Sequence, residues 1–292
     1  MNRILLLTDF EHYTYQAIHY SLQLALKMRA TLNIVDTAAD AFLSNQLNIS
    51  FLEFISQYNI GLSDNITNYF QRVQDFFSHD DLKNIVVDYY TEAKFKTEQI
   101  ELLIRRKEID LVILSSKEKM GIRNIFFRNE LDKLITEATC PILVLPKKAR
   151  FKKKLDKIVF ATNLVKEGKK AIQWGHDFAQ FLEVDYSFLH VTEDFSPTYH
   201  HQKTDFQLLV SELLGSDGFD FMEIQHDNVL TVLKDYTKEN QQSILAMYKK
   251  DKSALDKFLH IDFVEKMAFT AHSPILIFRE NMKALRRNLK MH

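Results

Sequence analysis

The sequence predicts an α/β protein built from two tandem domains, each a mostly parallel sheet covered by helices on both faces. Short aliphatic runs of strand length alternate along the chain with amphipathic stretches of helical period. This alternation starts near Arg3 and starts again near Leu155. The length of 292 residues agrees, since it is about twice that of a typical domain of roughly 100–150 residues.

The opening of the chain has the pattern of a β-α-β unit. Residues 3–7 form an aliphatic run that ends in Thr8-Asp9-Phe10. Between Ala17 and Leu26, apolar residues recur at the three- and four-residue spacing that builds one buried helix face. Residues 31–36 then read as a second strand. A strand, a helix and a further strand in this order indicate a parallel pair joined by a crossover helix.

The end of the first half has a similar pattern. Residues 110–146 predict a buried strand, a loop, a helix from about Asn124 and a second buried strand after Cys140-Pro141. Cys140 is the single cysteine of the chain, so it cannot form an internal disulfide. We interpret it as a buried packing thiol, because no activating neighbour is identifiable.

The second half repeats the first in order and spacing. Residues 156–164 repeat the opening strand, with Asn163 in the place of Asp9. The same number of positions separates Ser115 from Pro141 and Tyr248 from Pro274, so the closing strand of each half lies in the same register. The repeat predicts two copies of one fold.

These motifs resemble those of the universal stress protein family over roughly residues 1–146 and 155–278. The resemblance implies two doubly wound five-stranded sheets in the strand order 3-2-1-4-5, of the adenine-nucleotide alpha-hydrolase-like type. It also implies a role in stress response through binding or signalling, so we expect no enzymatic turnover. The expected division is a first domain at 1–147, a basic linker at 148–154, a second domain at 155–279 and a basic tail at 280–292.

The phosphate-binding glycines of that family are replaced in this chain. The family fingerprint G-x2-G-x9-G-(S/T) uses glycine because its backbone N–H groups can approach a phosphate closely. The matching positions hold Ser115, Glu118, Arg128 and Asn129. Glu118 would repel phosphate, so we expect no bound ATP and no cofactor. Arg128 could bind phosphate with paired hydrogen bonds, which leaves a nucleotide-binding switch with weak ATPase activity in the first domain as an alternative.

The resemblance places a vestigial nucleotide pocket at Asp9, Val35, Ser115, Arg128 and Asn129. In family members that bind ATP, the matching aspartate and valine line the base and ribose end of the nucleotide. Asp9 is equally suited to cap a helix N-terminus. No catalytic residue is predicted, because the chain has no G-x-S-x-G elbow, no G-x4-G-K-[ST] loop and no H-E-x-x-H motif.

Neither a metal site nor a nucleic-acid surface is expected. Adjacent side chains such as His200 and His201 do not face one another, so we interpret this pair as part of an exposed loop. Basic clusters lie at 146–154 and 283–290. We interpret them as solvated, because the net charge is −1 and no stacking aromatics accompany them.

No apolar stretch approaches the length of about 20 residues that a membrane span needs, and no export signal is recognisable. A cytoplasmic location is the default expectation.

We expect a protein partner of unknown identity, and pairing of the two domains through the apolar last strands at 142–145 and 275–278. A homodimer also remains open. Aromatic stripes at 51–58 and 66–77 predict amphipathic helices. Core packing is the favoured interpretation, and a docking surface for an interaction scaffold is the alternative.

Overall fold

The computed structural model describes residues 2–10, 14–37, 46–58, 73–91, 97–116, 133–149, 155–215, 219–249, 261–280 and 282. The chain divides into two compact units, with the boundary between Leu145 and Pro146. This boundary lies close to the expected end of the first domain at position 147. Each unit has its own set of strands and its own buried core, and each is described separately below.

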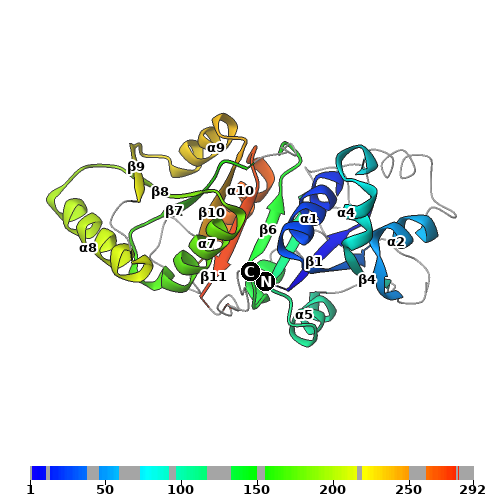
Figure 1. Ribbon diagram of the computed structural model, residues 1–292. Helices are drawn as coiled ribbons and strands as arrows, with labels where there is room; N and C mark the ends of the chain where they lie inside the picture. Colours follow the sequence, from blue (N-terminus) through cyan, green and yellow to red (C-terminus); the bar gives the residue numbers. More distant parts are fainter. Residues whose placement is uncertain are drawn as a thin grey trace. The chain divides into compact units, whose positions relative to one another are not determined.

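The first unit alternates strands and helices (Figure 1). Its assigned elements are β1 (Arg3–Thr8), α1 (Tyr15–Met28), β2 (Thr31–Asp36), β3 (Gln46–Ser50), α2 (Phe51–Tyr58), α4 (His79–Asn84), β4 (Val86–Thr91), α5 (Thr97–Arg106), β5 (Leu111–Ser115) and β6 (Ile142–Leu145). The predicted helix from about Asn124 falls largely outside the described residues, although 133–137 are helical.

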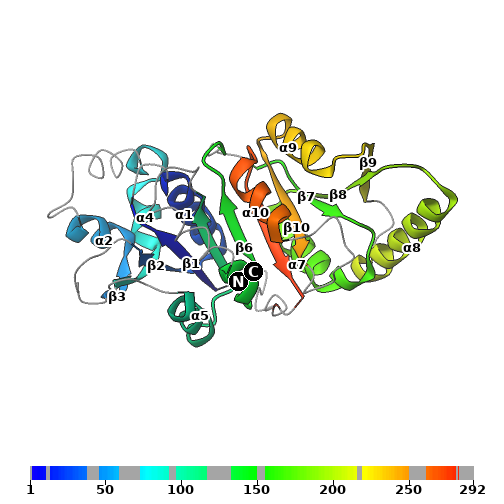
Figure 2. The same ribbon diagram turned by 180° about the vertical axis from the view of Figure 1, so that it is seen from behind.

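The sheet of the first unit has the strand order β3-β4-β2-β1-β5-β6. Five of these strands are parallel and follow the expected order 3-2-1-4-5. The sixth, β3, pairs antiparallel with β4 at the edge. The structure therefore describes eleven strands, one more than two five-stranded sheets would contain, and the prediction of two five-stranded sheets is wrong. Helix α1 covers one face of this sheet, as the opposite views in Figures 1 and 2 show.

The extra strand β3 gives only a weak sequence signal. It is short, and its register shifts between Gln46 and Ile49. Asn48, between them, has a positive φ of 61°, a conformation that asparagine tolerates better than most residues. Its backbone N–H donates to Oδ1 of Asp88 on β4 at 2.9 Å. A side chain distant in the sequence thus fixes this edge, which local periodicity cannot reveal.

The second unit has the assigned elements β7 (Lys157–Thr162), a 3₁₀ turn η2 (Lys166–Gly168), α7 (Lys169–Leu182), β8 (Asp185–Thr192), α8 (Pro197–Leu214), β9 (Asp220–Gln225), α9 (Val229–Glu239), β10 (Ser243–Lys249), α10 (Ile261–Thr270) and β11 (Ile275–Arg279). Its five strands are parallel and lie in the order β11-β10-β7-β8-β9. This is the predicted order 3-2-1-4-5, read from the other edge.

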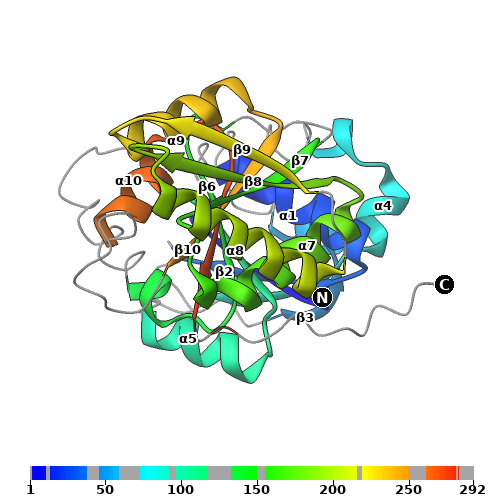
Figure 3. The ribbon, with the colours of Figure 1, turned by 90° about the vertical axis from the view of Figure 1, so that its left-hand side faces the viewer.

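Helices cover both faces of the second sheet. Helices α7 and α8 lie on one face (Figure 3), and α9 and α10 lie on the other (Figure 2). Phe188 of β8 faces the first pair, since its ring meets Phe206 of α8 edge-on at 5.5 Å. The next residue, Leu189, lines a cavity with Leu233 of α9. Alternate residues of a strand thus serve two cores, as a sheet buried on both faces requires.

Close packing between α7 and β8 depends on a glycine. A Cβ on Gly175 would lie 2.7 Å from the hydroxyl of Tyr186. That hydroxyl donates to the carbonyl of Ile172 at 3.2 Å, and burial raises the pKa of Tyr186 well above its ordinary value. The tyrosine is therefore held in place, and only a residue without a Cβ fits opposite it.

The cores contain the apolar residues that the sequence indicates. Leu143 and Leu276, in the middle of β6 and β11, are fully buried, and Cys140 is buried as expected. Phe51 and Phe54 of α2 are also buried. Core packing, rather than docking, is confirmed for this part of the aromatic stripe, whereas residues 66–72 lie outside the described residues.

Helix α8 corrects the interpretation of the histidine pair as loop residues. The helix starts at Pro197, so His200 and His201 lie in its first turns, where both are exposed. Ser196 is the N-cap, and its side chain accepts a hydrogen bond from the N–H of Tyr199 at 3.3 Å. A serine cap followed by proline at the first helical position is a recognised helix start.

Candidate functional site

The carboxyl edge of the sheet in each unit is where a functional site is expected. In doubly wound sheets, ligands bind outside the carboxyl ends of the strands, where the strand order reverses direction. In the first unit this switch point lies between β1 and β5, and in the second between β7 and β10.

In the first unit, three of the predicted site residues lie at this edge. Asp9 directly follows β1, Val35 is the next-to-last residue of β2, and Ser115 is the last residue of β5. Since β1 lies between β2 and β5, the structure brings the three together on neighbouring strands. Val35 is fully buried, so its side chain is not accessible. Arg128 and Asn129 lie outside the described residues.

Asp9 is not the N-cap residue of the helix that follows it, because Thr14 holds that position in α1. Instead it lies in a tight turn between Thr8 and Phe10. The Thr8 hydroxyl accepts a hydrogen bond from the N–H of Phe10 at 3.0 Å, and Phe10 has a positive φ of 54°. A bulky residue rarely adopts this conformation.

The same turn follows β7 in the second unit. The Thr162 hydroxyl accepts from the N–H of Leu164 at 2.9 Å, and Leu164 has a φ of 63°. Asn163 occupies the position that Asp9 has in the first unit. The two turns thus present a carboxylate in one unit and an uncharged amide in the other at corresponding places beside the switch point.

A small cavity opens at the switch point of the second unit. It encloses about 30 Å³, which is close to the share of one water molecule in liquid water. Asn163, Thr162 and His190 supply its polar wall. The remaining lining residues are apolar and come from both strands and helices: Ala161, Leu189, Val191, Val229, Leu233, Met247 and Phe263.

His190, near the end of β8, is the titratable residue of this wall. Its Nδ1 lies 2.7 Å from the carbonyl oxygen of Thr162. A carbonyl oxygen only accepts, so Nδ1 carries the proton and Nε2 is left as an acceptor in the neutral ring. Burial lowers the pKa of His190, and this outweighs the opposite effects of the Thr162 carbonyl and of Glu223. The ring is therefore held in its neutral form.

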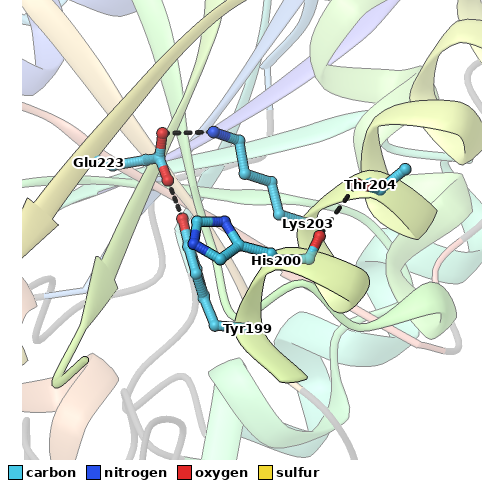
Figure 4. A network of polar contacts seen from close by, with 5 residues as sticks. All are labelled: Tyr199, His200, Lys203, Thr204 and Glu223. Carbon is cyan, nitrogen blue, oxygen red and sulfur yellow. Dashed lines mark hydrogen bonds and ion pairs between the residues drawn. The ribbon is translucent and has the colours of Figure 1, made fainter. Parts of the chain in front are cut away.

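Beside His190, α8 and β9 share a polar network that no sequence motif predicts (Figure 4). Glu223 of β9 accepts hydrogen bonds from the Tyr199 hydroxyl and from Nζ of Lys203, the latter at 2.5 Å. Burial opposes ionisation of Glu223, but the hydrogen bonds from Lys203 and Tyr199 outweigh it and lower its pKa. Burial and the neighbouring carboxylate raise the pKa of Tyr199, so the tyrosine remains the donor.

The cavity wall and the adjacent Glu223 network provide hydrogen-bonding groups that neighbouring contacts hold in place. Among the described residues, no group of three or more His, Cys, Asp or Glu side chains is placed to hold a metal ion. In the same part of the chain, no helix has the length and apolar character needed to cross a membrane. At the switch point of the second unit, Asn163 and His190 can donate to or accept from a ligand as uncharged groups.

Comparison with known proteins gives structural matches only. No protein-family model matches the sequence, and no curated protein matches it. Two similar solved structures come from Pseudomonas aeruginosa, a protein of unknown function and a putative universal stress protein. Both are 12% identical to this chain and cover 96% of it, with TM-scores of 0.64 and 0.63 and coverage of 93% and 94% of their own chains.

A third similar structure is a universal stress protein from Archaeoglobus fulgidus, which is 11% identical. The match covers 96% of this chain and 98% of that one, with a TM-score of 0.62. Sequence identities of 11–12% inform on the fold alone, and the three matches extend over both units. The fold of this chain is therefore that of the universal stress proteins, as the resemblance of its sequence motifs implied.

Proposed function

We propose that this chain is a universal-stress-type protein that acts in stress response by binding or signalling and does not turn over ATP. The observation that supports this best is the size of the cavity at the second switch point, about 30 Å³. Sites for small molecules and cofactors usually measure roughly 300–1,000 Å³. Met247 and Phe263 form part of its wall, and their bulk takes up space that a nucleotide would need.

The chemistry of the cavity wall supports the same proposal. Its polar side chains, Thr162, Asn163 and His190, are uncharged, because burial lowers the pKa of the imidazole. A triphosphate is bound most strongly by cationic side chains and by backbone N–H groups of glycine-rich loops. A neutral histidine and an amide favour an uncharged polar ligand or a polar group of a protein partner.

Thermal unfolding in the presence of Mg-ATP tests the proposal. ATP at 100 times its Kd would stabilise the folded state by about 2.7 kcal/mol. We expect millimolar Mg-ATP to leave the melting temperature unchanged and to release no phosphate. Asp9→Ala and Asn163→Ala form a matched pair, because the two residues occupy the same turn in the two units. A rise in melting temperature that only one of these variants abolishes would contradict the proposal and identify the unit that binds nucleotide.

A nucleotide switch in the first unit is the second candidate, and one observation favours it. The Ser115 hydroxyl is buried at the end of β5 and has no hydrogen-bond partner among the described residues. Buried hydroxyls are usually paired, so a ligand at this edge could supply the partner. If wild-type protein binds labelled ATP, Ser115→Ala should weaken binding about fivefold, the value of one hydrogen bond. No binding by the wild type would remove this candidate.

A further inference from the structure

A second cavity lies in the same unit, on the opposite face of the sheet from the switch-point cavity. It lies between α8 and the strands β8 and β9, and it encloses about 180 Å³. Phe188 of β8 lines it, whereas the adjacent residues Leu189 and Val191 line the switch-point cavity. Successive side chains of a strand point to opposite faces, so the two cavities are separated by the sheet.

Aromatic side chains form most of this cavity. Phe188, Phe206, Phe219 and Phe221 all line it. Phe188 meets Phe206 at an interplanar angle of 83° and Phe219 at 85°. Phe188 and Phe206 are almost completely buried by their neighbours, whereas Phe219 and Phe221 are half-buried. The last two can therefore contact a guest ring in the edge-to-face or stacked geometries that aromatic pairs prefer.

The volume fits a small ring. The cavity is partly open to solvent, since Gln207 is exposed and Ser211, Phe219 and Phe221 are half-buried, and its space measures about 180 Å³. An engineered cavity of about 150 Å³ with an apolar lining remains dry and binds benzene or xenon. By this comparison, the space accommodates one six-membered aromatic ring with a small substituent.

One side of the cavity is polar. Gln207 and Ser211, one helical turn apart on α8, complete the lining together with Val210. Ser211 is half-buried and Gln207 is exposed. Within the described part of the chain, neither side chain has a hydrogen-bond partner. A hydroxyl and an amide beside an apolar chamber can hydrogen-bond one polar substituent of the guest, whereas an ionised substituent would meet no opposite charge in the lining.

We propose that this cavity binds a small uncharged aromatic compound, a single ring with one hydroxyl or similar polar group. The ring lies against Phe219 and Phe221, and its substituent hydrogen-bonds Ser211. The proposal is separate from the function proposed above, because it concerns the other face of the sheet and involves no nucleotide.

Phenol is the probe for the first test, with benzene and benzoate for comparison. By calorimetry or ligand-observed NMR, we expect wild-type protein to bind phenol and benzene saturably and benzoate much more weakly. Ser211→Ala should weaken the binding of phenol about fivefold, which is the value of one hydrogen bond, and leave the affinity for benzene unchanged. Saturable binding of neither phenol nor benzene to wild-type protein would overturn the proposal.

A cavity-filling variant locates the site. Ser211→Phe should place a ring inside the cavity and abolish phenol binding. Leu208→Phe is the matched control, because Leu208 lies on the same helix and is 64% exposed, and this variant should bind like wild type. Equal phenol binding by folded Ser211→Phe and by wild type would contradict the assignment.

Xenon-pressurised crystals of wild-type protein give a measurement that does not depend on how the variants fold. We expect a xenon atom between α8 and β9, near the ring of Phe221. A cavity that remains empty under xenon pressure would also overturn the proposal.

Discussion

The imidazole of His190 stacks on the phenol ring of Tyr199, with ring centroids 5.5 Å apart and an interplanar angle of 17°. Tyr199 is hydrogen-bonded to Glu223, and Glu223 is ion-paired with Lys203. These contacts connect one helix, α8, to two strands, β8 and β9. Because the pKa values of three of the four side chains are shifted, we expect the attachment of α8 to the sheet to depend on pH.

His190→Gln should reduce the loss of stability in mild acid. Burial lowers the pKa of His190 in the folded protein below the ordinary value of 6.5, so below pH 6.5 the unfolded chain binds more protons than the folded one. Stability therefore falls as the pH drops from about 6.5 toward the folded pKa. Unfolding in urea at pH 7.5 and 5.5 should show a smaller difference for His190→Gln than for wild type. His201→Gln, at an exposed position, is the control. An equal change in stability between the two pH values in all three proteins would contradict the prediction.

Glu223→Gln should destabilise the protein at neutral pH. In acid, the stability difference between this variant and wild type should disappear. The hydrogen bonds to the carboxylate lower its pKa below the ordinary 4.5, so its contribution is present above that value and is lost as the pH falls through the folded pKa. Hydrogen bonds to charged groups are each worth about 1.5–3 kcal/mol, and we expect a loss of that order at pH 7. Denaturant unfolding at pH 7 and pH 3.5 measures it, with the exposed Glu212→Gln as control. A penalty that is the same at both pH values would show that the charge does not matter.

Gly175→Ala should destabilise the second unit by about 1–3 kcal/mol, because the new methyl group forces Tyr186 to move. Tyr186→Phe removes the hydroxyl that lies closest to the new Cβ. The double variant should therefore be more stable than the sum of the two single changes predicts. Chemical denaturation of all four proteins gives the coupling energy, and strict additivity would contradict the packing described here.

Leu143→Asp and Leu276→Asp should each unfold or aggregate the chain, because both side chains are fully buried and an unpaired buried charge costs several kcal/mol. Leu208→Asp is the matched control. Its side chain is 64% exposed, and we expect a change within about 0.5 kcal/mol. Circular dichroism and thermal melting separate the outcomes. Buried-site variants that melt like the control would show that the strand assignments are wrong.

The order of strands and helices could be predicted because it depends on local pattern. Aliphatic runs buried on both faces mark β1, β5 and β6, and helical spacing marks α1. The β3 edge could not be predicted in this way, since a hydrogen bond from Asn48 to Asp88 of another strand holds it. The start of α8 differs from the predicted loop, although Ser196 and Pro197 are a local signal for a cap and a first helical residue.

The candidate site was predictable only in part. Asp9 and Ser115 lie at the carboxyl edge where the motif comparison placed them. The network around Glu223 corresponds to no established sequence motif, because Tyr199 and Lys203 reach it only when α8 packs across β9. A glutamate between apolar residues in a strand, with an aromatic and a lysine one turn apart on the preceding helix, is the signal that could have indicated it.

The position of Glu223 also bears on self-association. Strand β9 is the last strand at its edge of the second unit's sheet, and an edge strand presents unpaired backbone groups to other chains. A charge that points inward from such a strand is one of the devices that discourage edge-to-edge pairing. Another chain that added a strand there and shifted β9 would have to separate the carboxylate from Lys203 and Tyr199. We therefore expect the ion pair that attaches α8 to β9 to discourage polymerisation through this edge.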